Sequence, residues 1–281
     1  MELTVFLAVI AAAVLHAVWN AVVKGGRDKH LSMTAIVLGH APIALVATII
    51  SPFPDPASWP YIFGGIAPHV VYQLFLLTSY RFGDLTQVYP IARGTAPILV
   101  ALISVVFLSV ALGTKELLAI FLIAVGIMSL SLVRQHDGLR NTRAAVLAFM
   151  TGCLIAGYSL VDGLGAREAG TALGFYRWLS LGNALVFAIV MRATKPGLIT
   201  RLRSEAVPAF VFGGIASFIA YGLVIWAFTQ APIALVTALR ETSIIAALFI
   251  GVFFLKERLD LAKVASTAIT LSGAILLRFA R

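Results

Sequence analysis

The feature that most constrains this chain is a series of apolar stretches, each about 20 residues long, separated by short polar connections. A helix of that length crosses the roughly 30 Å hydrocarbon core of a bilayer. These runs are too long and too uniformly apolar for barrel strands, and only helices otherwise satisfy their own backbone in lipid. We therefore predict an all-α integral membrane protein, with spans at 3–23, 31–50, 59–80, 85–108, 114–133, 144–162, 171–191, 206–229, 231–255 and 259–279.

Composition agrees with this class. Hydrophobic residues make up 60% of the chain and charged residues 12%, whereas soluble domains carry roughly 25% charged residues. Ten spans with short connections fill the 281 residues and leave no stretch for a soluble domain. Only Met1 and Glu2 precede the first run, so the basic start of a secretory signal is missing and we expect this run to be a permanent span. The single cysteine, Cys153, excludes an intramolecular disulfide.

The second half of the chain repeats the first. Phe63–Ala67 recurs as Phe212–Ala216, and laying Arg93 on Arg240 also places Gly126 on Gly273. Each half has five predicted helices, so the second half must enter the membrane upside down, which is the inverted repeat of secondary transporters. The prediction is a first five-helix repeat at 1–133, a cytoplasmic linker at 134–143 and a second five-helix repeat at 144–281, around a central cavity.

The basic residues indicate orientation. The formal net charge of +9 could suggest a nucleic-acid partner, but most Lys and Arg residues fall in the connections of one side, as in cytoplasmic loops. This assigns both termini to the outside and makes a nucleic-acid partner unlikely on charge grounds. The rich side holds Lys24, Arg27, Lys29, Arg81, Arg134, Arg140, Arg143, Arg192, Lys195, Arg201, Arg203, Lys256 and Arg258, against Lys115, Arg167, Arg278 and Arg281 opposite.

Two arginines lie inside apolar runs. Counting from the helix starts, Arg93 is about 12 Å and Arg240 about 13 Å into the hydrocarbon core, approached from opposite sides. A charge at that depth usually faces a cavity or a partner, and inverted-repeat transporters bind solutes near the midplane. We expect both to bind substrate. The structural alternative is pairing with Glu241, or with carbonyls that Pro90 and Pro97 leave without donors.

Further polar and aromatic side chains extend the candidate lining of the cavity. Tyr89 lies one turn before Arg93 and shares its helix face, where a phenol can hydrogen-bond a polar solute. Tyr72 and Tyr221 occupy matching positions of the two halves. Interhelical packing is the alternative role for each member of this set. The predicted substrate-binding residues are Arg93, Arg240, Tyr89, Glu241, Tyr72, Tyr221, Trp19, Asn20, His16, Tyr176 and Arg177.

Three features together resemble the EamA-type branch of the drug/metabolite transporter superfamily. They are Trp19-Asn20 with Lys24 in the first helix, the proline-bearing fourth helix, and the apolar run that closes in Phe254–Arg258. The resemblance covers the whole chain and implies two five-helix repeats around a central cavity. One departure is that the first half reads Leu108-Ser109-Val110 where the family has an acid, so Glu257 is the single such residue, and we expect it to be structural.

The function predicted is secondary transport of a small polar organic metabolite across the inner or plasma membrane by alternating access. Three deep arginines, with Arg177 as the third, face one deep acid, Glu241, which favours an anionic or zwitterionic solute. Export of amino acids or of cationic or amphipathic compounds is the alternative. The expected partners are the substrate, the lipid bilayer, and a coupling proton or counter-substrate, in a monomer or homodimer without cofactor or metal.

A different class, an intramembrane enzyme, needs a nucleophile with a base or a metal cluster. The sequence has no GxSxG, HExxH or Walker loop, and we find no pair of deep acids in it. We therefore expect no enzymatic activity and no ATP-driven pumping by this chain. The third hypothesis is a structural or receptor-like membrane protein. The repeat and the deep arginines argue against it.

The orientation is testable by thiol labelling. In a Cys153→Ser background, a cysteine introduced as Glu2→Cys or Arg281→Cys is expected to react with an impermeant maleimide in intact cells, because both termini are assigned to the outside. A cysteine in place of Arg192, on the basic side, serves as the internal control. Labelling of the terminal cysteines only after permeabilisation would refute the assignment.

Overall fold

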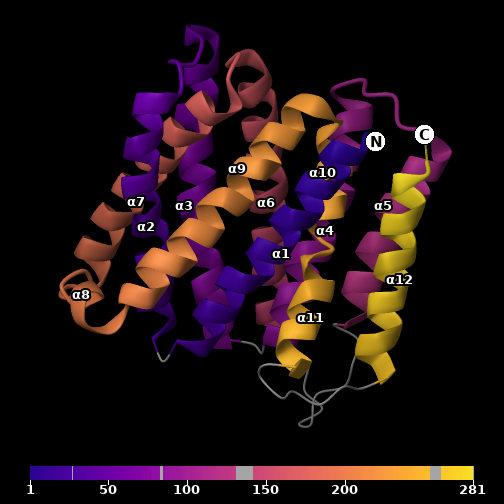
Figure 1. Ribbon diagram of the computed structural model, residues 1–281. Coiled ribbons are helices and arrows are strands. Elements are labelled where there is room, and N and C mark those ends of the chain that lie inside the picture. Colours follow the sequence, from indigo (N-terminus) through magenta and orange to yellow (C-terminus); the bar gives the residue numbers. More distant parts are fainter. Residues whose placement is uncertain (27, 83–84, 131–141, 254–260, 281) are drawn as a thin grey trace.

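The computed structural model describes residues 1–26, 28–82, 85–130, 142–253 and 261–280, and every regular element in them is helical. The chain runs from the N-terminus through α1 to α12 (Figure 1). The elements are α1 (Leu3–Gly25), α2 (Lys29–Ile50), η1 (Pro56–Ser58), α3 (Trp59–Phe82), α4 (Leu85–Val106), α5 (Thr114–Ser129), α6 (Thr142–Glu168), α7 (Ala172–Thr194), α8 (Leu202–Glu205), the π-helical η3 (Ala209–Gly213), α9 (Gly214–Gln230), α10 (Ile233–Arg240), α11 (Ser243–Phe253) and α12 (Leu261–Arg278).

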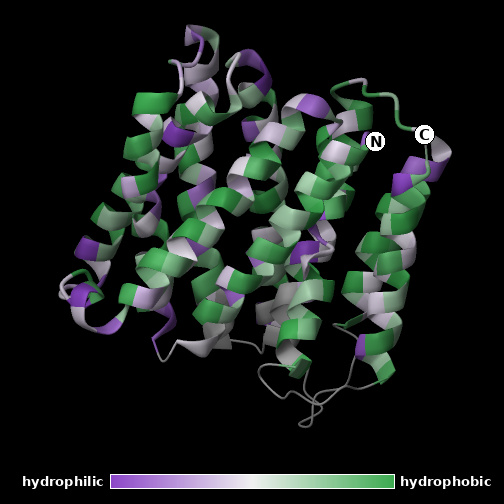
Figure 2. Ribbon diagram, in the orientation of Figure 1, coloured by the Kyte–Doolittle hydropathy of each residue, from purple (hydrophilic) through white to green (hydrophobic). Residues whose placement is uncertain are grey.

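The helices form a multi-pass membrane bundle. Among the described residues, eight stretches are long and apolar enough to cross a bilayer, and Pro90–Val106 is a shorter apolar helix. Figure 2 shows hydrophobic residues along the length of the helices and many of the hydrophilic ones near the two ends of the bundle. Apolar side chains such as Ile49, Phe121 and Phe212 remain exposed, as expected of a lipid-facing surface. The prediction of an all-α membrane protein is confirmed.

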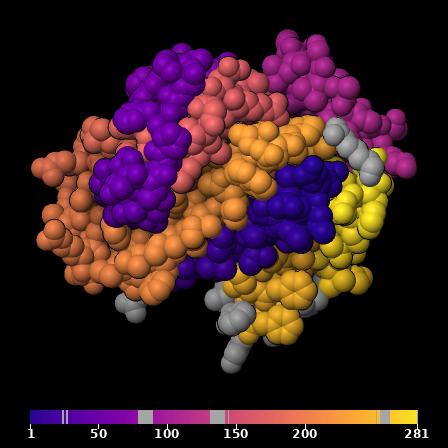
Figure 3. Space-filling view, turned by 45° about the horizontal axis from the view of Figure 1, so that its top comes forward, coloured from indigo at the N-terminus to yellow at the C-terminus, as the bar shows by residue number. Residues whose placement is uncertain are grey.

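Helices from the two halves of the sequence pack against each other. α1 lies against α9 and α11, α3 against α6, α2 against α7, and α5 against α12. In the space-filling view, the start of the chain lies between segments from its second half (Figure 3). Both ends of the chain are at the same end of the bundle, where the Arg278 guanidinium donates to the Met1 carbonyl at 3.3 Å. The core is therefore built across the halves.

Glycines allow the closest of these approaches. A Cβ on Gly39 of α2 would lie 2.2 Å from the Phe210 carbonyl and 3.1 Å from the Cα of Gly214, so α2 and the η3–α9 segment meet backbone to backbone. Gly126 and Gly273, which the repeat aligns, both lie in the α5–α12 contact. Small residues at helix contacts are the usual way to bring membrane helices together.

One predicted span is interrupted. The run at 231–255 was expected as a single helix, but α10 ends at Arg240 and α11 begins at Ser243, with a turn at Glu241 and Thr242. The backbone there makes hydrogen bonds of the 3-10 type, in which an N–H donates to the carbonyl three residues earlier. Glu241 N donates to Ala238 O at 3.1 Å, and Thr242 N donates to Leu239 O at 3.0 Å. The expectation failed because hydrophobicity alone does not reveal a break at a charged pair. Glu257 and the predicted linker up to residue 141 lie outside the described residues.

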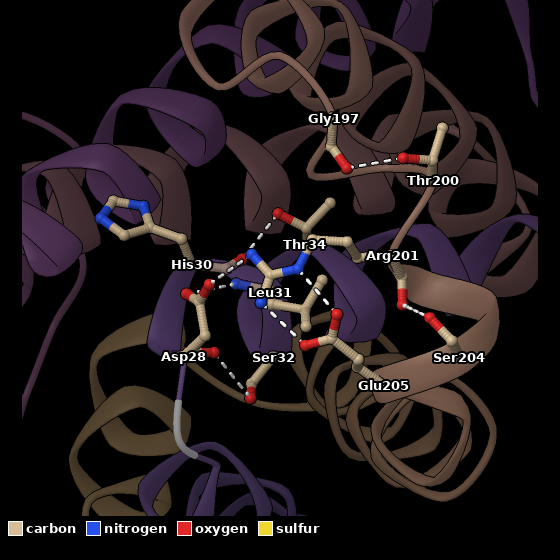
Figure 4. A network of polar contacts seen from close by, with 10 residues as sticks. All are labelled: Asp28, His30, Leu31, Ser32, Thr34, Gly197, Thr200, Arg201, Ser204 and Glu205. Carbon is tan, nitrogen blue, oxygen red and sulfur yellow. Dashed lines mark hydrogen bonds and ion pairs between the residues drawn. The ribbon is translucent and has the colours of Figure 1, made fainter.

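An ion-pair network joins two connections on the side of the bundle that carries most of the basic residues, called the basic face below (Figure 4). Arg201 lies 3.1 Å from Asp28 Oδ2 and 2.8 Å from Glu205 Oε2, while Asp28 Oδ1 accepts from Leu31 N and caps α2. The hydrogen bond from Arg201 lowers the pKa of the Glu205 carboxyl. At Asp28, partial burial acts to raise the pKa, but the Leu31 N–H and Arg201 outweigh it and lower the pKa. The network ties the α1–α2 connection to the segment between α7 and α9.

The glycine contact generates a stability prediction. Gly39→Ala is expected to lower the melting temperature of the purified protein, because the new methyl group collides with rigid backbone of η3. Gly157→Ala in α6 is the matched control, since a Cβ there has nothing within 4 Å. Helix propensity alone favours alanine by roughly 0.8–1.0 kcal/mol, so the control should be neutral or stabilising. Equal melting temperatures for the two variants would contradict the close contact.

Candidate functional site

A cavity of about 70 Å³ lies in the interior of the bundle, between α1, α2, α3, α6, α7, α9 and α10. Of its 20 lining residues, 13 are polar or aromatic and the other seven are apolar. Polar side chains at the wall of a cavity can hydrogen-bond water or a polar solute. Its polar and aromatic lining residues are His16, Trp19, His40, His69, Tyr72, Gln73, Tyr158, Tyr176, Ser180, Asn183, Ser217, Tyr221 and Arg240.

The two predicted arginines converge on one acid. Arg93 Nε lies 2.5 Å from Glu241 Oε2, and its Nη2 donates to Ser243 Oγ at 2.9 Å. Arg240 Nη2 lies 3.5 Å from Glu241 Oε1. The side chains of all three charged residues are at most 7% exposed. α4 is thus tied to the break between α10 and α11 by a buried ion pair.

The two arginines nevertheless differ in what they face. Arg93 is directed to Glu241 and Ser243 and does not line the cavity, whereas Arg240 does. Arg240 Nε–H has no hydrogen-bond partner among the described residues. Its guanidinium carbon lies 6.0 Å from the centre of the Tyr158 ring. Arg240 is therefore the cation that a solute in the cavity would meet.

A second buried acid escaped the sequence analysis. Asp162 is 0% exposed, and its Oδ2 lies 2.7 Å from His69 Nε2 and 2.6 Å from the hydroxyl of Tyr221, which donates to it. The statement that Glu241 is the single deep acid is therefore wrong. The predicted span ended at residue 162, but α6 continues to Glu168, which places Asp162 about 9 Å inside the helix end.

The Phe63–Ala67 repeat supplied the missed signal. Gly65 lies one turn before His69 on the same face of α3. A Cβ on Gly65 would lie 2.6 Å from Asp162 Oδ1, so only glycine leaves room for α6 to bring this carboxylate against α3. The repeated glycine pair thus marks a helix approach that assembles part of the site.

Several predicted lining residues do come together. Tyr72 and Tyr221, from matching positions of the two halves, lie 5.2 Å and 6.0 Å from Tyr158 between ring centres. Tyr176 packs on Tyr221 at 5.6 Å, and all four rings line the cavity. Tyr158, not included in the predicted set, therefore stands at the centre of this aromatic cluster.

The first helix contributes in part. His16 and Trp19 line the cavity, and Trp19 Nε1 donates to His16 Nδ1 at 3.2 Å. Asn20 instead donates to the His16 carbonyl at 2.8 Å, within its own helix, and does not line the cavity. Glu241 also stays outside the lining. The side chain of Tyr89 lies outside the described residues.

Arg177 has a different role from the one expected. It does not line the cavity; its Nη1 donates to the carbonyls of Ala47 at 3.1 Å and Ser51 at 2.7 Å, at the end of α2. Its guanidinium carbon also lies 5.1 Å from the centre of the Phe53 ring. The last carbonyls of a helix have no partner inside the helix, so a buried guanidinium is well placed to satisfy them. Arg177 is a helix cap.

Three amide and imidazole groups give the cavity unused hydrogen-bonding capacity. His40 Nε2, Gln73 Oε1 and Asn183 Oδ1 are buried, border the cavity and have no hydrogen-bond partner among the described residues. Buried polar groups are normally satisfied, so these are places for solute or water. In the part of the chain that the structure describes, no three His, Cys, Asp or Glu side chains are grouped to hold a metal ion.

Comparison with known proteins places this fold. The model of the EamA-like transporter family matches residues 3–132 and again 142–279. The chain belongs to this family. Its two matched regions account for nearly the whole sequence and agree with the repeat seen in it. EamA proteins are transporters rather than enzymes, and the bundle is a membrane-transporter fold.

Solved structures support the same fold. Twenty-nine chains are similar, among them one crystal structure that is 16% identical, with a TM-score of 0.78 over 100% of this chain and 98% of that chain. At that identity the likeness concerns the fold alone. No curated protein matches the sequence. Of the residues that carried the EamA resemblance, Trp19 lines the cavity and Asn20 braces its helix, while Phe254–Arg258 lies outside the described residues.

The capping role of Arg177 is testable. Arg177→Gln is expected to destabilise the protein by roughly 2–4 kcal/mol, because the end of α2 loses charge-assisted hydrogen bonds in a buried place. Arg192→Gln, an exposed change in the last turn of the same helix, is the matched control. Thermal unfolding in detergent measures both. A melting temperature unchanged from the wild type would mean that Arg177 does not hold α2.

Proposed function

We propose that this EamA protein is a secondary transporter of a small polar organic metabolite with an anionic group, carried across the inner or plasma membrane by alternating access. The observation that carries the proposal is the position of Arg240 at the wall of the buried aromatic cavity. Its Nε–H lacks a hydrogen-bond partner among the described residues, and the residue is 2% exposed. A buried cation with an unused donor is expensive unless a ligand meets it.

The guanidinium geometry favours an oxyanion. Its planar fork offers parallel N–H donors that match the two oxygens of a carboxylate or a phosphonate-like head. Arg93 is directed to Glu241 and Ser243, so we assign it to positioning Glu241 beside Arg240 rather than to the solute. Arg240 therefore receives the anionic group, and Arg93 supports the site from behind.

The buried charges near the cavity balance one another, contrary to the expected excess of positive charge. Arg177 is engaged at the end of α2, and Asp162 adds a second buried carboxylate, so Arg93 and Arg240 are balanced by Glu241 and Asp162. The anion is not needed to cancel an excess of positive charge. An anion is favoured instead by the unused Nε–H of Arg240. Among the described residues that line the cavity, Arg240 is also the one Lys or Arg side chain.

The aromatic cluster suits the other end of the solute. The rings of Tyr72, Tyr158, Tyr176 and Tyr221 could pack on an apolar body or attract an ammonium group through cation–π contact. Gln73 and Asn183 add polar atoms for a hydroxyl or amine. A zwitterion is therefore within the proposed class, with its cationic end held here rather than by Glu241 or Tyr89.

Packing supports the inverted repeat on which alternating access would rest. Exchanging equivalent helices of the two halves converts the α1–α9 contact into the α6–α3 contact. The end of α6 meets the connection that follows α2, because Asp55 N donates to Ala169 O at 3.1 Å. In Figure 1 this is the end of the bundle at which α1 starts, so α1 and α6 run in opposite directions. On this proposal, the repeats at 1–133 and 144–281 are joined by a linker at 134–143 and rock around the cavity. The transporter is a monomer or a homodimer.

Flux through sealed proteoliposomes tests the function. Vesicles would be offered radiolabelled lactate, succinate, phenylalanine and choline, and we expect protein-dependent accumulation of an anion or zwitterion. Arg240→Lys is expected to reduce uptake by about tenfold or more despite the retained charge, because an ammonium cannot present a fork. Arg192→Lys, an exposed change in α7, is the control.

The outcomes separate the alternatives. Uptake of choline alone, unaffected in Arg240→Lys, would contradict the anionic class and favour a carrier of cations. Uptake of phenylalanine would place the protein among carriers of amino acids. No flux of any solute would favour a membrane protein that does not transport, or an enzyme, over a carrier.

A further inference from the structure

The second buried acid has a feature that solute binding at Arg240 does not use. Asp162 Oδ2 receives both the His69 Nε2 contact at 2.7 Å and the Tyr221 hydroxyl at 2.6 Å. An ionised carboxylate only accepts hydrogen bonds, so facing it the imidazole carries its proton on Nε2. The Nδ1 lone pair is then the position that can take another proton. His69 borders the cavity, whereas Asp162 is fully buried behind it.

We propose that His69 and Asp162 form a proton-binding site and that proton uptake there is linked to binding of the anionic solute, which makes the protein a proton–anion symporter. The proposal rests on the proposed function and adds the coupling ion to it. In the binding step a hydronium ion that enters the cavity gives a proton to His69 Nδ1, so that one O–H bond breaks, one N–H bond forms and a neutral water molecule is left. The resulting imidazolium is held by the Asp162 carboxylate.

Charge balance supplies the linkage. With a neutral His69, the four buried charged side chains at the cavity and directly behind it, Arg93, Arg240, Glu241 and Asp162, sum to zero. An anion at Arg240 would leave this low-dielectric region with one net negative charge, and protonation of His69 returns the sum to zero. Each ligand therefore favours binding of the other, and thermodynamic reciprocity makes the two effects equal.

Tyr158 joins the two binding places. Its ring stacks on the His69 imidazole with 4.2 Å between centres, and the Arg240 guanidinium carbon lies 6.0 Å from the same ring. A positive charge on His69 therefore raises the potential close to Arg240, which favours an anion and disfavours a cation there. The titratable and charged groups that border the cavity with His69, or contact it from behind, are His16 from α1, His40 from α2, Tyr72 from α3 itself, Tyr158 and Asp162 from α6, Tyr176 from α7, Tyr221 from α9 and Arg240 from α10.

Proton-jump currents test the site without any solute. Proteoliposomes on a solid-supported membrane would be stepped from about pH 8 to about pH 6. We expect a transient current from the wild type, and none above protein-free liposomes from Asp162→Asn or His69→Gln. Both variants would be checked for correct folding by size-exclusion chromatography and thermal unfolding. Because the two substitutions lie on different helices, the test can still be read if one variant misfolds.

Glu116→Gln is the matched control. Glu116 is also a buried carboxylate, but it accepts from Gly113 N at 2.9 Å at the start of α5, away from the cavity, and glutamine suits the same capping position. This variant should keep the wild-type current. A current that survives in both Asp162→Asn and His69→Gln, or a wild type without any current, overturns the proton site.

Coupling is tested with the panel solute that the flux vesicles accumulate. An inward proton gradient should accelerate its uptake by the wild type and leave uptake by Asp162→Asn unchanged. Gradient-independent uptake by the wild type overturns the coupling but leaves the transport function in place. Proton-jump currents from a protein that moves none of the panel solutes would instead refute the transport function and retain the proton site.

Discussion

The arrangement of this site depends on the buried ion pair between Arg93 and Glu241. Removing two charges from water is costly, and the loss is recovered only when partners meet at close range, as Nε and Oε2 do at 2.5 Å. The carboxylate belongs to the turn that separates α10 from α11. An unbroken helix would leave no such turn, so the pair, the break and the placement of Arg240 at the cavity form one structural unit.

Two further arginines hydrogen-bond carbonyl groups at helix ends that have no partner inside their own helix. Arg177 of α7 donates to the last carbonyls of α2, and Arg167 of α6 donates to the carbonyls of Phe228 and Ala231 at the end of α9, both at 2.8 Å. Each helix end receives a guanidinium from a helix of the second half. Arginine in this fold therefore serves helix ends as well as the cavity, and burial alone does not distinguish the role of Arg177 from that of Arg240.

That distinction marks the limit of sequence reasoning here. Hydrophobic run length and the five-residue repeat indicated the helical membrane class, and they located Arg93, Arg240, Tyr72 and Tyr221 near one another. The sequence did not reveal that Arg177 turns toward α2, because its neighbours come from a helix distant along the chain. Asp162 was missed for a related reason: the span predicted from hydrophobicity ends at this residue and so places its acid at the membrane edge, whereas the helix continues for six more residues.

The exposed network on the basic face contrasts with the buried pair. Arg201 is 42% exposed at its side chain and joins Asp28, from the first half, to the second half of the chain. Water and salt screen such a contact, so it can break and re-form with little change in free energy. The halves are thus joined firmly at the buried Arg93–Glu241 pair and loosely at this surface. Under the proposed rocking of the halves, the buried pair would stay closed, and the ionic strength of the solution would set how readily the exposed contact between Arg201 and Asp28 opens.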